Sequence, residues 1–104
     1  MIAVNQDTGK IEWDDKLPSS PYGAASVTGN VVFTTTYNGY LYAFNAATGA
    51  VLLKTPLSAG TNSPVTIDGD YVLAGAGAAL PKNQQPLIIA YKLGAKGTLP
   101  DTVR

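Results

Sequence analysis

The sequence contains neither cysteine nor histidine, and it carries little charge. Without these two residue types the chain can form no disulfide framework, no cysteine nucleophile, no zinc site of Cys and His ligands, and no histidine general base. Charged residues make up 13% of the 104 positions, which is about half of the usual fraction. The seven Lys and Arg residues balance the seven Asp and Glu residues. A neutral chain is not expected to bind nucleic acid, because that requires a basic surface.

The few charges are unevenly distributed along the chain. No charged residue lies between Lys16 and Lys54, yet Asn, Ser, Thr, Gly and Pro interrupt this stretch too often for a membrane span. The first residues also lack the basic start and apolar centre of a signal peptide. A small domain that stands alone normally exposes more charge to water. Composition therefore describes the class of protein but does not establish an independent activity.

Two separate blocks of the sequence repeat at an offset of 40 residues. The pairs are residues 3–11 with 43–51 and residues 28–33 with 68–73. A weaker copy at residues 88–92 matches residues 40–44 once an inserted segment before it is allowed. A period of about 40 residues is the length of one four-stranded blade of a β-propeller. The repeat therefore predicts propeller blades.

The complete copy of the repeat reads as four short strands. We expect these strands at residues 23–28, 31–36, 40–44 and 50–55. They are rich in β-branched and aromatic residues, and Asn38-Gly39 is a strong hairpin signal because both residues tolerate positive φ. No segment has a sustained apolar period of 3.6 residues. The sequence thus predicts an all-β fold of antiparallel four-stranded blades.

The repeat also divides the chain into four parts. Residues 1–17 are predicted to end a first blade, residues 18–56 to form a complete blade, and residues 57–93 to form the following blade with an inserted loop at 75–87. Residues 94–104 have the composition of a flexible tail. The chain then holds about two to two and a half blades, an incomplete propeller. Uncovered blade faces predict association with remaining blades or with further copies of the chain.

The residues around the first Thr-Gly pair carry a family resemblance. They are Ala3, Asp7, Thr8, Gly9, Lys10 and Trp13, which together resemble the tryptophan-docking repeat of the pyrroloquinoline-quinone (PQQ) propeller family. The acidic position of that repeat falls at Asn5, and Asp7 stands two residues later. The second copy keeps Ala43, Asn45, Thr48 and Gly49 but has Leu53 in place of the tryptophan. The resemblance covers about residues 1–93 and is greatest to the C-terminal part of a quinoprotein alcohol dehydrogenase-like propeller.

The resemblance implies roles for residues and for the whole chain. It implies that Trp13 is a structural clamp between blades, with Ala3, Gly9, Ala43 and Gly49 in supporting structural roles. It further implies that the chain is a C-terminal fragment of a PQQ-dependent dehydrogenase-like protein, inactive and without cofactor when alone. PQQ and calcium are the cofactors implied for the complete protein, and its location would be periplasmic or extracellular. The alternative is a cofactor-free module that serves as a protein-binding or envelope-assembly scaffold.

Candidate site residues come from loops expected at one end of the blades. The approaches to the first strands and the loops between second and third strands share that face, and functional residues of propellers gather on such loops. From these loops we select Tyr22, Tyr37, Asn62 and Ser63 as cofactor-binding candidates that face the channel. The inserted loop either covers a pocket on this face or is a surface excursion.

The carboxylates form no convincing catalytic or metal site. Asp14 and Asp15 are adjacent on an expected strand, so their side chains point to opposite faces. The Asp68-Gly69-Asp70 segment lacks the closing Glu of a calcium loop and is expected to be a hairpin turn. Ser19 and Ser20 have no histidine to activate them. We therefore assign no catalytic residue and no metal ligand within this chain.

Overall fold

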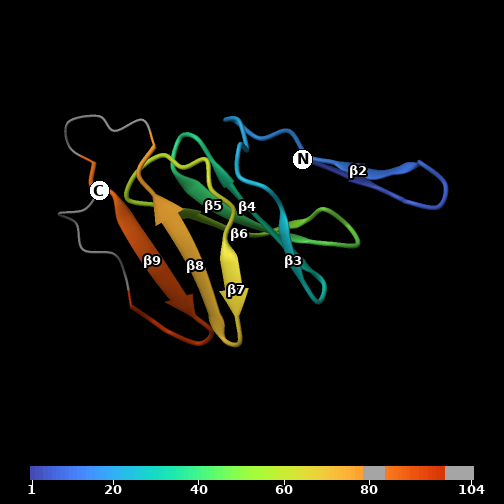
Figure 1. The fold of residues 1–104 in the computed structure, drawn as a ribbon. Coiled ribbons are helices and arrows are strands. Elements are labelled where there is room, and N and C mark those ends of the chain that lie inside the picture. The colour runs from blue at the N-terminus through green and yellow to red at the C-terminus, as the bar shows by residue number, and fades with distance from the viewer. Residues whose placement is uncertain (79–83, 98–104) are drawn as a thin grey trace.

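The computed structural model describes residues 1–78 and 84–97, which form three antiparallel sheets and contain no helix. The first sheet pairs β1 (Ile2–Val4) with β2 (Ile11–Asp14). The second has the order β3 (Ser26–Thr28), β4 (Val31–Thr36), β5 (Tyr40–Asn45) and β6 (Val51–Pro56). The third has the order β7 (Thr66–Asp68), β8 (Tyr71–Ala76) and β9 (Leu87–Lys92) (Figure 1). The predicted all-β, incomplete propeller is thereby confirmed.

Several strand limits differ from the sequence-based expectation. β3 begins at Ser26 rather than at residue 23, because the pairing with β4 starts only at Ser26. Gly75 and Ala76, which were predicted to start the inserted loop, belong to β8 and pair with β9. Strand pairing also gives Lys92 the position of Asn45, one residue away from the alignment that the sequence suggested.

Parts of two predicted segments lie outside the described residues. These are residues 79–83 of the inserted loop and residues 98–104 of the tail. In the described part of the tail, Gly94 has a φ of 79° and the amide of Ala95 donates to the carbonyl of Lys92 (3.0 Å), which makes a turn directly after β9.

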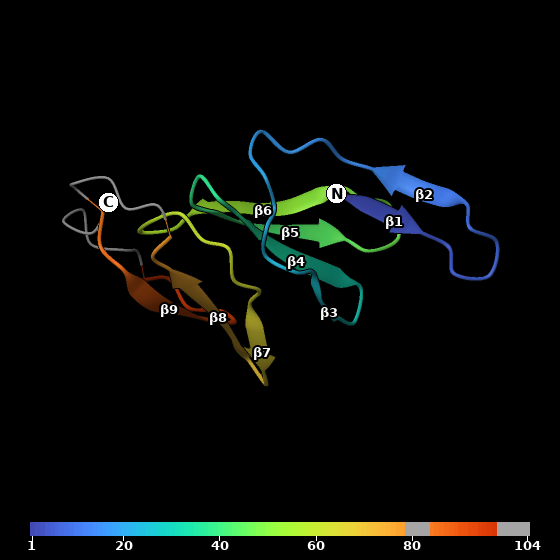
Figure 2. The ribbon, with the colours of Figure 1, turned by 45° about the horizontal axis from the view of Figure 1, so that its top comes forward.

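The three sheets lie in a row with the second sheet in the middle (Figure 2). A buried cluster of Val32, Tyr42 and Phe44 contacts Met1 and Trp13 and so joins the second sheet to the first. Both faces of the middle sheet are covered, which is why all residues from 41 to 44 are buried although side chains alternate between the faces of a strand.

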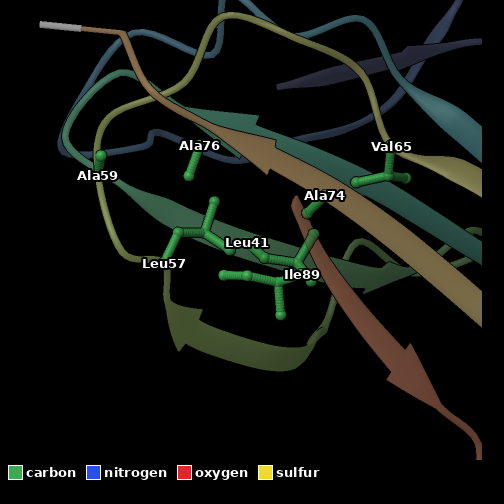
Figure 3. Packing of buried hydrophobic residues seen from close by; sticks show 7 residues of the cluster. All are labelled: Leu41, Leu57, Ala59, Val65, Ala74, Ala76 and Ile89. Carbon is green, nitrogen blue, oxygen red and sulfur yellow. The ribbon is translucent and has the colours of Figure 1, made fainter. Parts of the chain in front are cut away.

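A second buried cluster joins the second sheet to the third. Its members are Leu41, Leu57, Ala59, Val65, Ala74, Ala76 and Ile89. Figure 3 shows Leu41 of β5 close to Ile89 of β9, with Leu57 beside them. Complete burial of a side chain such as Leu41 stabilises the fold by about 1.5–3 kcal/mol. The fold is therefore held together largely by apolar contacts between blade-like sheets.

The two Thr-Gly turns are copies of each other in three dimensions. Asn5 and Asn45 each accept two backbone amides at their Oδ1 atoms, at 2.9 and 3.2 Å. Gly9 and Gly49 donate to the carbonyls of those asparagines at 2.8 Å and have φ values of 72° and 75°. A positive φ is readily adopted only by glycine. The repeat seen in the sequence therefore fixes one turn geometry that is used twice.

Trp13 connects the first sheet to the second of these turns. Its Nε1 donates to the carbonyl of Ala46 at 2.8 Å, and its ring stacks on Phe44 with centroids 5.9 Å apart. A Cβ atom added to Gly49 would lie 2.7 Å from the indole ring, whereas one added to Gly9 would have no heavy atom within 4 Å. Gly49, rather than Gly9, thus forms the surface on which the ring of Trp13 lies. Ala3 stands opposite Trp13 in the strand pair, as Ala43 stands opposite Leu53.

Candidate functional site

Two loops of the second sheet meet at the end where we predicted the site. The amide of Tyr37 donates to the carbonyl of Ser20 at 3.0 Å, and the amide of Asn38 donates to Oγ of Ser19 at 3.2 Å. These bonds hold the segment before β3 against the β4–β5 hairpin. The rings of Tyr22 and Tyr37 then meet edge to face with centroids 5.6 Å apart, an arrangement that aromatic pairs favour.

The 57–63 loop packs against that hairpin through glycines. The amide of Leu57 donates to the carbonyl of Gly39 at 2.8 Å, and a Cβ on Gly39 would lie 2.9 Å from the carbonyl oxygen of Ala59. A Cβ on Gly60 would overlap the carbonyl oxygen of Tyr37. The close approach of these backbones therefore requires glycine at both positions. It brings a loop of the third sheet beside Tyr37.

Three consecutive buried threonines of β4 hold the surrounding loops through hydrogen bonds. Thr34 donates to the carbonyl of Gly23 at 3.1 Å, and Thr35 donates to the carbonyl of Ser63 at 2.7 Å. Thr36 donates to Oδ1 of Asn38 at 2.7 Å. All three residues are at most 1% exposed. Buried hydroxyl groups need such partners, so this part of β4 anchors the loops on both sides of it.

Two open hollows result at this end of the molecule. One has a volume of about 570 Å³ and is lined by Ser19, Ser20, Tyr22, Tyr37 and Asn62. The other has a volume of about 550 Å³ and is lined by Thr61, Asn62, Ser63, Pro86, Ile88 and the end of β8 with the residues after it. Asn62 borders both hollows. The four candidates selected from the sequence therefore lie around two adjoining hollows. Tyr22 and Tyr37 line the first, Ser63 lines the second, and Asn62 lines both.

The start of the inserted segment forms one wall of the second hollow. The amides of Gly77 and Ala78 both donate to the carbonyl of Gly60, at 2.9 and 2.8 Å. Gly60 and Ala78 also form an isolated antiparallel bridge. These bonds place the first residues of the segment on the candidate face, beside Asn62. The centre of the segment, residues 79–83, lies outside the described residues.

The chemistry of the two linings is neutral. Hydroxyl groups, one amide side chain and two phenol rings can donate and accept hydrogen bonds, and no described lining residue is charged. Ca²⁺ takes six to eight oxygen ligands, usually with several carboxylates among them. Among residues 1–78 and 84–97 no three or more His, Cys, Asp or Glu side chains are grouped to hold a metal. These linings therefore do not fit a calcium ion, and we derive no reaction step through one.

No carboxylate of the described residues lines either of the two hollows, although Asp14 and Asp15 border a neighbouring hollow together with Ser19 and Ser20. Asp68 ends β7 and Asp70 follows Gly69, whose φ of 53° makes the hairpin turn that the sequence predicted. Asp14 ends β2 opposite Ile2, and the carbonyl of Asp15 accepts a hydrogen bond of 2.7 Å from the amino group of Met1. Within the described ranges no helix is long and apolar enough to cross a membrane.

Sequence reasoning missed the residues that support the site. Gly23 and Gly60 show no distinguishing pattern in the sequence, and the repeat does not align them with each other. Gly23 has no room for a Cβ because the carbonyl oxygen of Ser63 would lie 2.7 Å from it. The run Thr34-Thr35-Thr36 was a usable signal, because three consecutive hydroxyl groups in a buried strand must all find partners.

The PQQ-repeat family model, whose description is "Outer membrane protein assembly factor BamB", matches residues 1–91. The chain therefore belongs to the PQQ-repeat β-propeller family.

Curated relatives include several quinoprotein dehydrogenases. The chain is 39% identical over 87 residues to a quinoprotein ethanol dehydrogenase of Pseudomonas putida, a match that covers 76% of this chain and 14% of that enzyme. It is 38% identical over 86 residues to the quinoprotein alcohol dehydrogenase PedH of Pseudomonas putida, with the same two coverages. A polyvinylalcohol dehydrogenase of a Pseudomonas species is 38% identical over 58 residues, 56% of this chain and 9% of that protein. The chain thus spans about a seventh or less of the length of these relatives.

A solved structure has the same fold. A europium-containing methanol dehydrogenase superimposes with a TM-score of 0.72 at 18% sequence identity, and the match covers 88% of this chain and 19% of that enzyme. At this identity the similarity establishes the fold alone. The three sheets of this chain accordingly have the fold of part of a β-propeller.

Proposed function

We propose that this chain is the C-terminal blade segment of a PQQ-dependent dehydrogenase-like propeller and that it is inactive alone. The observation that carries the proposal is the 38–39% identity to two quinoprotein dehydrogenases over 86 and 87 residues. The tryptophan repeat and the stacked sheets are consistent with this proposal, because both are features of propeller blades arranged in a ring.

The neutral linings explain why the segment would be inactive alone. In the complete protein PQQ would supply the electron-accepting chemistry of alcohol oxidation, and calcium would be the ion that accompanies it. We assign the calcium ligands to parts of the propeller beyond this chain, because the described linings offer no carboxylate. Tyr22, Tyr37, Asn62 and Ser63 would then shape the channel mouth next to the cofactor. Trp13 would act as the clamp that keeps neighbouring blades in register.

A segment exchange tests this proposal. The 87 aligned residues of the Pseudomonas putida quinoprotein ethanol dehydrogenase are replaced by the matching residues of this chain, and PQQ-dependent reduction of a dye by ethanol is measured after loading with PQQ and calcium. We expect the exchanged enzyme to retain activity and the 104-residue chain to show none. A folded exchange enzyme without any activity, at a native-like melting temperature, would contradict the proposal.

A second candidate function is a cofactor-free scaffold for protein binding or envelope assembly. It is favoured by the description of the matching family model, which names an outer membrane assembly factor. Under this alternative the exchange enzyme would lose PQQ binding. The two adjoining hollows would then be a binding surface for polypeptides rather than the mouth of a cofactor channel.

A further inference from the structure

The first hollow of the candidate face carries polar groups that the fold itself does not use. Its volume of about 570 Å³ lies within the range of about 300–1,000 Å³ that is usual for ligand sites. Oγ of Ser19 accepts the amide of Asn38 at 3.2 Å. The other polar side-chain groups of the lining have no hydrogen-bond partner among residues 1–78 and 84–97; they belong to Ser20, Tyr22, Tyr37 and Asn62. The lining therefore offers hydroxyl and amide groups to a ligand.

The loops that carry these groups are fixed by bonds elsewhere. The amide of Tyr37 donates to the carbonyl of Ser20 at 3.0 Å, and the buried hydroxyl of Thr35 donates to the carbonyl of Ser63, next to Asn62, at 2.7 Å. Tyr22 is 67% exposed and Tyr37 is 41% exposed. The rings thus stand at the surface on a backbone that is already in place, which lowers the entropic cost of binding.

The two tyrosine rings form a corner. Their centroids lie 5.6 Å apart and their planes meet at 85°, so the contact places the edge of one ring against one face of the other. The face of an aromatic ring is negative, and it attracts the C–H groups of carbons that carry oxygen. A flat aromatic ligand held on both sides would need two parallel faces, which this corner does not provide. A sugar ring, with C–H groups on its face and hydroxyl groups around its rim, matches both the rings and the polar groups.

The lining is also uncharged, unlike that of its neighbour. The adjacent hollow shares Ser19 and Ser20 but is lined in addition by Asp14, Asp15 and Lys16. In the first hollow no described residue could pair with a phosphate or carboxylate group, and removing such a group from water without a partner is costly. The chemistry therefore favours a neutral ligand with several hydroxyl groups.

We propose that this hollow binds a neutral saccharide. One tyrosine ring takes the C–H face of the sugar, and Ser20 and Asn62 exchange hydrogen bonds with hydroxyl groups at its rim. A simple alcohol would use only one of these groups at a time. The inference goes beyond the proposed function, because it concerns binding by this chain alone and needs neither PQQ nor calcium. Its failure would leave the proposed function untouched.

The test titrates cellobiose, a neutral disaccharide, into the 104-residue chain and follows the NMR shifts. We expect saturable changes at Tyr22, Tyr37 and Asn62 and none around Trp13. Tyr22→Ala removes an exposed ring and should weaken binding by about tenfold or more. The matched Tyr71→Ala variant removes the ring of another exposed residue, outside this hollow, and should bind as the original chain does.

A second variant keeps the test valid if Tyr22→Ala disturbs the loop. Asn62→Ala changes an exposed residue and should weaken binding several-fold through the loss of its amide. Absence of saturable shifts at the hollow, or unchanged binding in both variants, would overturn the proposal. Equal binding of 1-propanol would show that a single hydroxyl group suffices, and binding of tetraglycine without binding of cellobiose would assign the hollow to a polypeptide. Either result would overturn the saccharide assignment.

Discussion

The side chain of Trp13 and the backbone of Ala46 are joined by a hydrogen bond of 2.8 Å from Nε1 to the carbonyl oxygen. Trp13 lies in β2 of the first sheet, Ala46 lies in the turn between β5 and β6 of the second sheet, and the two residues are separated by 33 positions in the sequence. The bond therefore couples the first sheet to the second, and the stacking of the indole on Phe44 adds apolar contact to it. The stability of the stacked sheets should depend on this contact.

Trp13→Phe is the direct test of that hydrogen bond. The phenyl ring keeps much of the stacking, but it has no N–H to donate to Ala46. We expect the free energy of unfolding to fall by about 1 kcal/mol, the usual net value of one such bond. Urea unfolding followed by circular dichroism measures it. Tyr71→Phe, which changes an exposed phenol, is the control and should shift stability by less than about 0.5 kcal/mol.

Gly49→Ala and Gly9→Ala form a matched pair. Both glycines have nearly the same φ, 75° and 72°, so an alanine at either site costs about 1–2 kcal/mol of backbone strain. Only Gly49 lies against the ring of Trp13, and displacing the ring adds about 1–3 kcal/mol. We expect Gly49→Ala to be the more destabilising variant by that difference. Equal losses at the two positions would show that the ring does not rest on Gly49.

Thr35→Val probes the anchoring of the candidate site. The valine keeps the branched shape of the side chain, but the carbonyl of Ser63 loses its 2.7 Å hydrogen bond. We expect a loss of about 1 kcal/mol in stability and faster amide exchange in the 61–63 segment. Thr66→Val changes an exposed strand residue and serves as control. A stability and an exchange pattern identical to those of the control would contradict the anchoring role.

Much of the fold could be predicted because the repeat encodes it locally. The Thr-Gly pairs fix two identical turns, and alternating residues such as Leu41 and Tyr42 already indicate a strand with two apolar faces. The inserted segment was placed too early because Gly75 and Ala76 resemble loop residues. They remain in β8 because their backbones pair with β9. This pairing is a tertiary contact, and it cannot be predicted from the local composition.

The candidate site could be predicted in position but not in structure. The blade topology put Tyr22, Tyr37 and Asn62 on one face, and the structure groups them around one hollow. The contacts that hold them there depend on Gly60, whose missing side chain admits the carbonyl of Tyr37. A close approach between two loops leaves no periodic signal in the sequence, so it could not be found before the fold was known.

Tyr37→Ala tests the contribution of this hollow in the exchanged dehydrogenase. The ring of Tyr37 is 41% exposed and meets that of Tyr22 edge to face. Its removal should weaken substrate or cofactor binding several-fold and leave the melting temperature nearly unchanged. Tyr71→Ala removes the ring of a residue that is 42% exposed and lies outside both hollows. It should leave both substrate binding and cofactor binding unchanged. If the two variants behave alike, the hollow makes no contribution to the site.

Equilibrium binding of PQQ tests the central claim most directly, because it does not require a productive substrate. The exchanged dehydrogenase and the parent enzyme are titrated with PQQ at saturating calcium, and the quinone bound per protein is measured. The account predicts one PQQ per exchanged enzyme with an affinity within about tenfold of the parent, equivalent to about 1.4 kcal/mol. It would be contradicted by a folded exchanged enzyme, with the melting temperature of the parent, that binds no PQQ.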